Sequence, residues 1–189
     1  MKIIASTSAA EKNVFYTLPD TALRQGGKPF FVPEDACQGR LLLAARVCRQ
    51  GRYVGLQFAR RYFDSVTCVI AFTKTERLQK LQKAGLPWAE AVGFDDSVCV
   101  GKFMPIDSMT TSNDLQLTAT VGDEKQHSAG IDFADIDAFV AEASCHFTLH
   151  QGDYLLVSPK HEKTSFPAQQ NIHVEVTLCD HTLLSFNMK

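Results

Sequence analysis

The chain has no apolar run that approaches the roughly 20 residues of a membrane-spanning helix. Its N-terminal stretch, MKIIASTSAAEKN, holds too short an apolar segment for a secretory signal peptide. The small residues in this stretch suit a first strand followed by a loop instead. These absences argue against a membrane protein and predict a cytoplasmic location.

An excess of charge of either sign is also missing. The 19 Lys and Arg residues and 21 Asp and Glu residues leave a formal net charge of -2, with a sequence pI near 6.3. Nucleic acids and anionic membrane surfaces attract proteins that carry a clear positive excess. We therefore expect neither nucleic acid nor a membrane as a partner.

Internal repeats, low-complexity blocks and Pro-rich or Gly-rich linkers do not occur in the chain. Its 189 residues, 45% of them hydrophobic, suffice for one sizeable core. The sequence therefore predicts a single domain that spans residues 1–189.

No two cysteines stand at Cys-x-x-Cys spacing, which argues against a zinc or redox motif. Most of the six cysteines lie in apolar, strand-like segments, among them Cys68 in SVTCVIAF and Cys99 in SVCVG. We expect these to be buried structural thiols. Cys145, His146 and His150 lie close together in the sequence. A catalytic cysteine needs a histidine partner in space, and sequence proximity alone does not show one. We therefore interpret His146 and His150 as surface residues.

Three consecutive patterns in the second half of the chain predict local structure. LQLTATVGDEKQ (115–126) alternates apolar and polar residues and reaches Gly122-Asp123, which favours a hairpin. In IDFADIDAFVAEASCHF (131–147) the apolar residues recur at helical spacing, with Asp132 or Asp135 as the N-cap. FTLHQGDYLLVSP (147–159) turns at 151–153 into an apolar strand.

The remaining segments follow from the same periodicities. In the first half of the chain we expect strands from 28 to 47 with a hairpin near 50–52, followed by a helix over 55–65. A buried strand over 66–72 and a helix over 74–85 that ends at Gly85 come next. Residues 101–114 are expected to form an irregular connection.

The order of these elements resembles the fumarylacetoacetate hydrolase family, whose members read roughly NGE-x-x-Q, then a helix, then TL-x-x-GD-x-I-x-TGTP. The matching residues here are Gly122, Gln126, Thr148, Leu149, Gly152, Asp153 and Leu155. Similar pieces lie in KIIASTSAAEK (2–12), GRLLLAARV (39–47) and PWAEAVGFDDSVCVG (87–101), so the resemblance covers nearly all of the chain. It implies an α+β, mainly β fold: a mixed-sheet β-roll, as in the C-terminal domain of that family, with a few short helices.

In that family three carboxylates hold a divalent cation, usually Mg²⁺ or Mn²⁺. The two acids of E-x-E-L-A fall here on Arg40 and Leu42, in the register set by Leu43-Ala44. The third acid, in NDVTARDLQ, falls on Phe72 when the segment is anchored on Leu78-Gln79. Because hard cations need anionic oxygen ligands, we expect the Mg²⁺ or Mn²⁺ site to be lost, with no cofactor.

The other positions that carry chemistry in the family are also substituted. The His and Glu of NYADHVRE fall on Lys12 and Phe15, the Lys of KGFD on Val92, and the Lys of FLKP on Val32. The TGTP turn has become Val157-Ser158-Pro159-Lys160, one residue short. No residue is therefore assigned as catalytic.

The resemblance places a vestigial pocket at Lys12, Arg40, Leu42, Phe72, Val92 and Asp95, where Asp95 matches the Asp of GFD. Without acids to balance them, Lys12 and Arg40 would favour an anion. In the alternative, Arg40 extends into solvent and the apolar members fill the cavity. A further alternative is a rearranged metal site formed by Asp64, Glu76, Asp95 and Asp96. The spacing of these four acids does not require such a site.

Three functions follow. The first is a catalytically silent family member, a pseudoenzyme kept as a non-metal binding, regulatory or assembly subunit, which could also bind a small carboxylate metabolite through Lys12 or Arg40. As in its relatives, it would form a homodimer or a heteromer with a related active subunit. The second is a metal-dependent hydrolase, decarboxylase or isomerase of small dicarbonyl acids with a rearranged site. The third is a structural dimer with a closed pocket, and since fold does not fix function, the sequence leaves all three open.

Overall fold

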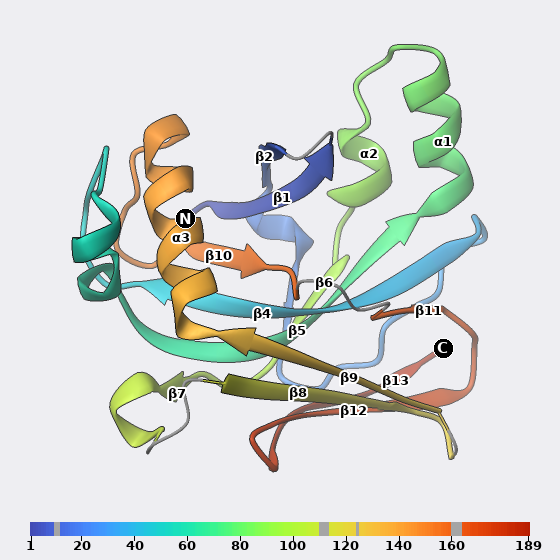
Figure 1. Cartoon of the computed structure of the whole chain (residues 1–189). Coiled ribbons are helices and arrows are strands. Elements are labelled where there is room, and N and C mark those ends of the chain that lie inside the picture. Colours follow the sequence, from blue (N-terminus) through green and yellow to red (C-terminus); the bar gives the residue numbers. More distant parts are fainter. Residues whose placement is uncertain (10–11, 110–113, 124, 160–163) are drawn as a thin grey trace.

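The computed structural model describes residues 1–9, 12–109, 114–123, 125–159 and 164–189 (Figure 1). The side chains of residues 8, 9, 12 and 125 lie outside this description. Within the described part of the chain, the strands form two sheets that face each other.

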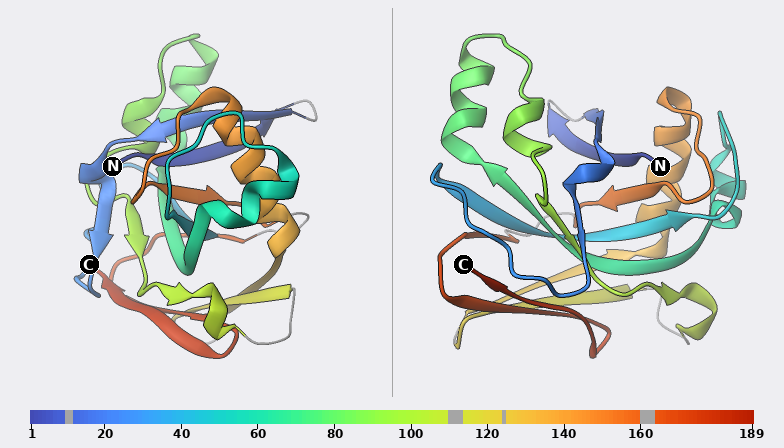
Figure 2. Two further views of the ribbon diagram at one scale, coloured as in Figure 1. Left: turned by 90° about the vertical axis from the view of Figure 1, so that its left-hand side faces the viewer. Right: turned by 180° about the vertical axis from the view of Figure 1, so that it is seen from behind.

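The larger sheet has nine strands among the described residues, in the order β2-β1-β10-β4-β5-β6-β3, with β11 beside β4 and β7 beside β5. The strands are β1 (Ile3–Ala9), β2 (Lys12–Leu18), β3 (Leu23–Gln25), β4 (Cys37–Val47), β5 (Phe63–Lys74), β6 (Val98–Val100), β7 (Met104–Pro105), β10 (Tyr154–Val157) and β11 (Ser165–Pro167). β1 runs parallel to β10, and β3 runs parallel to β6, whereas β4 and β5 are antiparallel. Figure 2 shows that this mixed sheet is strongly curled, which confirms the predicted β-roll.

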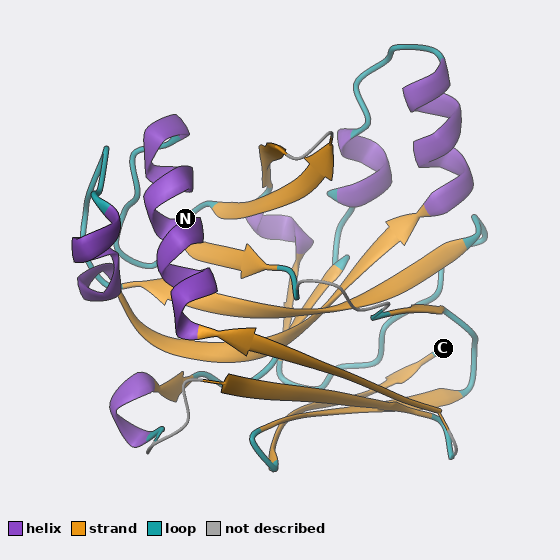
Figure 3. Ribbon diagram, viewed as in Figure 1, coloured by secondary structure: helices purple, strands orange, loops and turns teal. Residues whose placement is uncertain are grey.

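The smaller sheet is antiparallel and has the order β13-β12-β8-β9. Its strands are β8 (Asp114–Val121), β9 (Lys125–Asp132), β12 (Ile172–Leu178) and β13 (His181–Met188). The helices are α1 (Thr75–Lys83), α2 (Ala89–Val92), α3 (Phe133–His146) and the short 3₁₀ turns η1 (Asp20–Ala22), η2 (Leu56–Tyr62) and η3 (Ile106–Ser108). Figure 3 shows α1 and α2 on the side of the larger sheet that faces away from the smaller one.

Strand β4 divides its side chains between two apolar clusters because successive residues of a strand point to opposite faces. Leu41 and Leu43 enter the main core, which lies between the two sheets and includes the apolar face of α3. Leu42 and Ala44 enter a second cluster on the opposite face, together with Val92 of α2. The candidate site lies on this second face.

The local predictions of the second half of the chain are confirmed. β8 and β9 form the expected hairpin, and Gly122 adopts the positive φ of 65° that the turn requires. Asp132 caps α3: its carboxylate accepts a hydrogen bond from the Ala134 backbone N–H at 3.2 Å, and Asp135 closes the capping box. The strands over 66–72 and 154–157 and the helix that ends before Gly85 also form as expected.

Three predictions in the first half of the chain are wrong. Of the strands expected over 28–47, the long one begins only at Cys37. No hairpin closes near 50–52, because β4 pairs with β5 across the whole connection 48–62. The helix expected over 55–65 is the 3₁₀ turn η2, and its last predicted residues belong to β5, whose pairing with β4 overrides the local periodicity.

Candidate functional site

Arg40 lies where two cavities meet. β10 ends at Val157, whereas its parallel neighbour β1 continues to Ala9. Beyond this end, Ser6 of β1, Ser158 and Arg40 line both cavities. Arg40 is exposed, and among the described residues no carboxylate or carbonyl oxygen accepts a hydrogen bond from its guanidinium.

The smaller cavity lies on the second face of the larger sheet and has a volume of about 60 Å³. Its walls carry mainly apolar side chains from six elements, with Arg40 at one side: Ala5, Tyr16, Leu18, Leu42, Ala71, Val92 and Leu156. Leu42 and Val92 are 5% and 9% exposed, so both side chains are buried in this wall.

The larger cavity has a volume of about 480 Å³ and reaches from Arg40 to α3. Asp135 and Glu142 of α3 and Asn13 of β2 supply its polar wall, and Phe139 supplies an apolar one. The Asn13 amide donates a hydrogen bond to the Glu142 carboxylate at 2.8 Å, which ties β2 to the helix. A cavity of this volume can hold a small organic molecule.

Tyr16 is the titratable neighbour of Arg40. Burial raises the pKa of the Tyr16 phenol above its ordinary value, and the Arg40 guanidinium acts against that rise. The Tyr16 ring packs edge-on against Trp88, with ring centroids 4.9 Å apart. The side chain is therefore held in the cavity wall as a phenol that stays protonated at neutral pH.

The residues of this wall do not fit a divalent cation. A hard cation needs several anionic oxygens, whereas the positions that face the smaller cavity from β4 and β5 carry Arg40, Leu42 and Ala71. Within the described ranges, no group of three or more His, Cys, Asp or Glu side chains could hold a metal ion. We therefore derive no chemistry through a metal.

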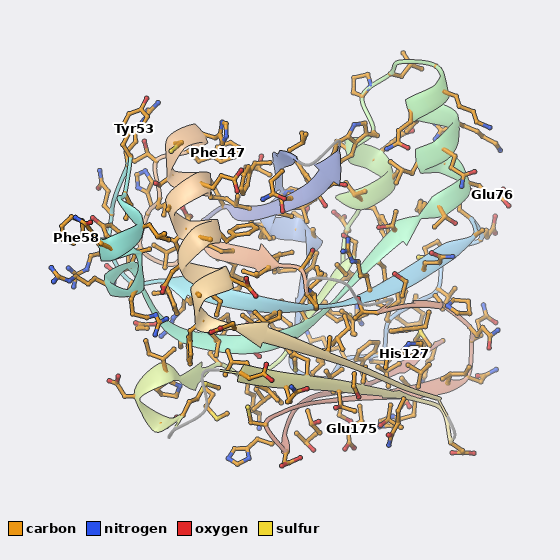
Figure 4. All side chains as sticks on the ribbon, in the orientation of Figure 1. Tyr53, Phe58, Glu76, His127, Phe147 and Glu175 are labelled. Carbon is orange, nitrogen blue, oxygen red and sulfur yellow. The ribbon has the colours of Figure 1, made fainter. Side chains whose placement is uncertain are left out.

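The four acids of the alternative metal site do not gather. Asp64 pairs with Arg46 at 3.2 Å, and Asp96 pairs with Arg24 at 2.7 Å. Glu76 lies on the outer side of α1 (Figure 4). Asp95, also expected at the vestigial pocket, is exposed and does not line either cavity at Arg40.

The placement of Phe72 differs from the expected one. Its backbone borders the smaller cavity, but its ring stacks on Phe30 in the main core, with centroids 3.7 Å apart. Ala71 is the residue directly opposite Arg40 in the β4–β5 ladder. Ala71, one residue before the predicted Phe72, therefore shares the face of Arg40.

Two further assignments also change, the first of them through strand alternation. Phe15, at the expected Glu position, points to α3 and contacts Phe139 at 5.1 Å between ring centroids. Tyr16, the next residue, is the one that lines the cavity. Val32, expected at the Lys position of FLKP, packs on the main core, whereas Leu18 lines the cavity.

The structure thus brings four of the six predicted pocket residues to one cavity: Arg40, Leu42, Phe72 and Val92. Asp95 lies elsewhere, and the side chain of Lys12 lies outside the described residues. The sequence analysis missed Tyr16, Leu18, Ala71, Ser6 and Ser158. The alternation in KNVFYTL, which puts Tyr16 and Leu18 on one face, was the only signal for two of them.

The thiols and histidines of the described residues add no second site. Cys68 and Cys99 are buried as expected, and burial raises the pKa of each thiol to about 12. His146 and His150 are exposed, as predicted. Within the described residues, no helix is long and apolar enough to cross a membrane.

Residues 2–178 match the family model described as fumarylacetoacetate (FAA) hydrolase C-terminal. The chain therefore belongs to this family. A solved structure of Escherichia coli protein 1262, described as a candidate isomerase, superposes with a TM-score of 0.88 at 25% identity and covers 100% of this chain and 91% of that one.

Two curated relatives carry named activities. Oxaloacetate tautomerase YcgM of Escherichia coli (strain K12) is 25% identical over 182 residues, which are 94% of this chain and 82% of the relative. The mitochondrial oxaloacetate tautomerase fahd-1 of Caenorhabditis elegans is 25% identical over 135 residues, which are 69% of this chain and 63% of the relative, less than two thirds of its length. Because these relatives are enzymes, the comparisons favour an enzyme over a catalytically silent protein.

Proposed function

We propose that this chain catalyses keto–enol interconversion of a small oxo dicarboxylic acid such as oxaloacetate, and that Arg40, rather than a metal, holds the acid. The position of Arg40 carries the proposal: its guanidinium lies at the meeting point of the two cavities, and no described acceptor occupies it. The tautomerase names of the two curated relatives support the choice of substrate class.

The chemistry of arginine suits this task. A guanidinium binds a carboxylate through two parallel N–H donors and keeps its charge at any physiological pH. The apolar wall of Leu18, Leu42 and Val92 lowers the local dielectric constant on one side, which strengthens the attraction to an anion. The same positive charge stabilises the enolate character that develops during tautomerisation.

The acid lies across both cavities in this proposal. The smaller one, at about 60 Å³, has room only for one end of a dicarboxylate. The larger one, at about 480 Å³, accepts the remainder. Ser6 and Ser158, which line both, offer hydroxyl donors at the junction.

The test follows the decay of enol oxaloacetate by ultraviolet absorbance, with protein stripped of metal and kept in EDTA. The wild-type protein should accelerate the decay in EDTA. Loss of a charged hydrogen-bonding partner costs about 1.5–3 kcal/mol, so Arg40→Ala should lower kcat/KM by roughly 10- to 100-fold. Arg46→Ala is the matched control, because Arg46 lies on the same strand, 44% exposed and paired with Asp64.

Two results would contradict the proposal. Acceleration that appears only with excess Mg²⁺ or Mn²⁺ would support the metal-dependent alternative. Equal loss in the Arg40 and Arg46 variants would remove the assigned role of Arg40.

A second candidate is a non-catalytic binder of the same acids. It is favoured by the substitutions that leave the wall without an acidic ligand set. Calorimetric binding of oxaloacetate without any acceleration of enol decay would support it. A homodimer, or a heteromer with a related active subunit, stays a prediction that light scattering of the purified protein checks, and the cytoplasmic location stays a prediction as well.

A further inference from the structure

We infer that Tyr16 is the proton donor of this reaction, an inference that rests on the proposed keto–enol activity. Tyr16 lines the same cavity as Arg40, and Ala5 and Leu18 from the neighbouring positions of β1 and β2 surround it. Of the described side chains that line this cavity, only Tyr16 carries a titratable O–H group; the other described ones are apolar, hydroxyl or guanidinium groups.

The direction of the side chain follows from strand register. Tyr16 lies opposite Ala5 in the β1–β2 ladder, and Ala5 lies opposite Leu156 in the β1–β10 ladder. Ala5 and Leu156 belong to the buried cluster of the second face, and Tyr16 packs against that cluster. Leu42 and Ala44 of β4 belong to the same cluster, so Tyr16 and the Arg40 side of β4 share one face.

Two neighbours prepare the phenol for this role. The edge-on contact with Trp88, at 4.9 Å between ring centroids, restricts the ring to one orientation. Burial raises the pKa of Tyr16, which keeps it protonated, while Arg40 favours the phenolate. The guanidinium therefore both holds the substrate carboxylate and stabilises the anion that Tyr16 becomes after it donates its proton.

In the direction from enol to ketone, the Tyr16 O–H bond breaks and its proton passes to the carbon next to the enol carbon. The electron pair of the carbon–carbon double bond forms the new C–H bond. The enol O–H bond breaks, and its electron pair completes the carbonyl double bond. The released proton returns to the Tyr16 phenolate through water, so the step consumes no oxidant, reductant or metal.

The decisive experiment measures the face of the carbon to which the proton is delivered. The wild-type protein converts enol oxaloacetate in heavy water, the ketone is reduced at once to malate, and NMR gives the position of the deuterium. A fixed donor labels one face, whereas protonation by solvent labels both. Tyr16→Phe should lower the rate about 100-fold or more and randomise the label, because a positioned acid typically contributes at least that much.

Binding separates this inference from the proposed function. Tyr16→Phe should bind oxaloacetate as the wild type does in calorimetry, since Arg40 is intact. The matched control is Tyr62→Phe: Tyr62 is also half-buried and lies beneath an arginine, Arg49, but it does not line either cavity at Arg40. Tyr62→Phe should keep both the rate and the one-sided label.

Three outcomes decide the matter. A wild-type protein that does not accelerate enol decay overturns the proposed function. An active wild type whose Tyr16→Phe variant keeps the rate and the one-sided label overturns the assignment of Tyr16 alone. If Tyr16→Phe does not fold, replacement of Tyr16 by 3-fluorotyrosine keeps the ring and lowers the pKa of the phenol. The pH above which the rate falls should then be lower than in the wild type. A pH profile equal to that of the wild type overturns the assignment.

Discussion

Arg40 of β4 lies directly opposite Ala71 of β5, and this pairing decides which side chains share the face of the candidate site. Phe72 points to the other face, where its ring stacks on Phe30. The wall beside the guanidinium is therefore a methyl group rather than an aromatic ring, which leaves room for a ligand next to Arg40.

The pairing predicts how a metal site would be rebuilt. Arg40→Glu, Leu42→Glu and Ala71→Asp together place three carboxylates on one face of neighbouring strands, so we expect this variant to bind Mn²⁺. The measurement is the loss of the free Mn²⁺ signal in electron paramagnetic resonance. The variant that carries Phe72→Asp in place of Ala71→Asp is the control and should not bind; tighter binding by the control would show that our register is wrong.

Asp153 is predicted to stabilise the fold through the N-terminal strand. It is fully buried, accepts the Lys2 and His150 backbone N–H groups at 2.7 and 2.9 Å, and pairs with the Lys2 ammonium at 2.7 Å. Asp153→Ala should lower the free energy of unfolding by about 3–5 kcal/mol, because it leaves buried donors and a charge unpaired. Urea denaturation measures this, and Asp64→Ala, which breaks the exposed pair with Arg46, should cost no more than about 1 kcal/mol.

Gly39 is predicted to be intolerant of a side chain. A Cβ at this position would lie 2.8 Å from the Phe166 ring and 3.0 Å from the Phe72 ring. Gly39→Ala should therefore destabilise the protein by about 1–3 kcal/mol through overpacking. Gly55→Ala is the matched control, since its Cβ would meet only Phe58 at 3.6 Å, and a similar loss of stability in both variants would argue against the assigned contact.

The buried thiols predict a loss of stability at alkaline pH. Burial raises the pKa of Cys37 to about 11 and those of Cys68 and Cys99 to about 12, from the ordinary value of 9.0. Between pH 9.0 and about 11 the unfolded chain loses these protons while the native protein keeps them, so the free energy of unfolding falls as pH rises. Each thiol contributes at most about 1.4 kcal/mol per pH unit.

Single variants test the contribution of the thiols. In chemical denaturation from pH 8 to 11, Cys68→Ala or Cys99→Ala should reduce the pH slope by about one thiol's share. Cys145→Ser, which replaces a thiol at an exposed position, is the control. A slope that is equal in all three variants would mean that other groups cause it.

Local chemistry explains the parts of the fold that the sequence predicted correctly. Helix α3 begins at Asp132 because its carboxylate satisfies a free backbone N–H, an interaction confined to four residues. Gly122 and Gly152 mark turns because both adopt positive φ. The helix prediction for residues 55–65 was wrong because the pairing of β5 with β4, which is not local, competes with the helical periodicity.

The candidate site shows the same division. The sequence by itself determined that Arg40 and Leu42 share one face of their strand, because they stand two residues apart. Only the tertiary structure decided that Tyr16 and Ala71, rather than Phe15 and the ring of Phe72, face the cavity. The physical reason is that a shift of one residue moves a strand side chain to the other face of the sheet. Hydrogen bonds between strands far apart in the chain, such as β1 and β10, fix the register and so exclude this shift.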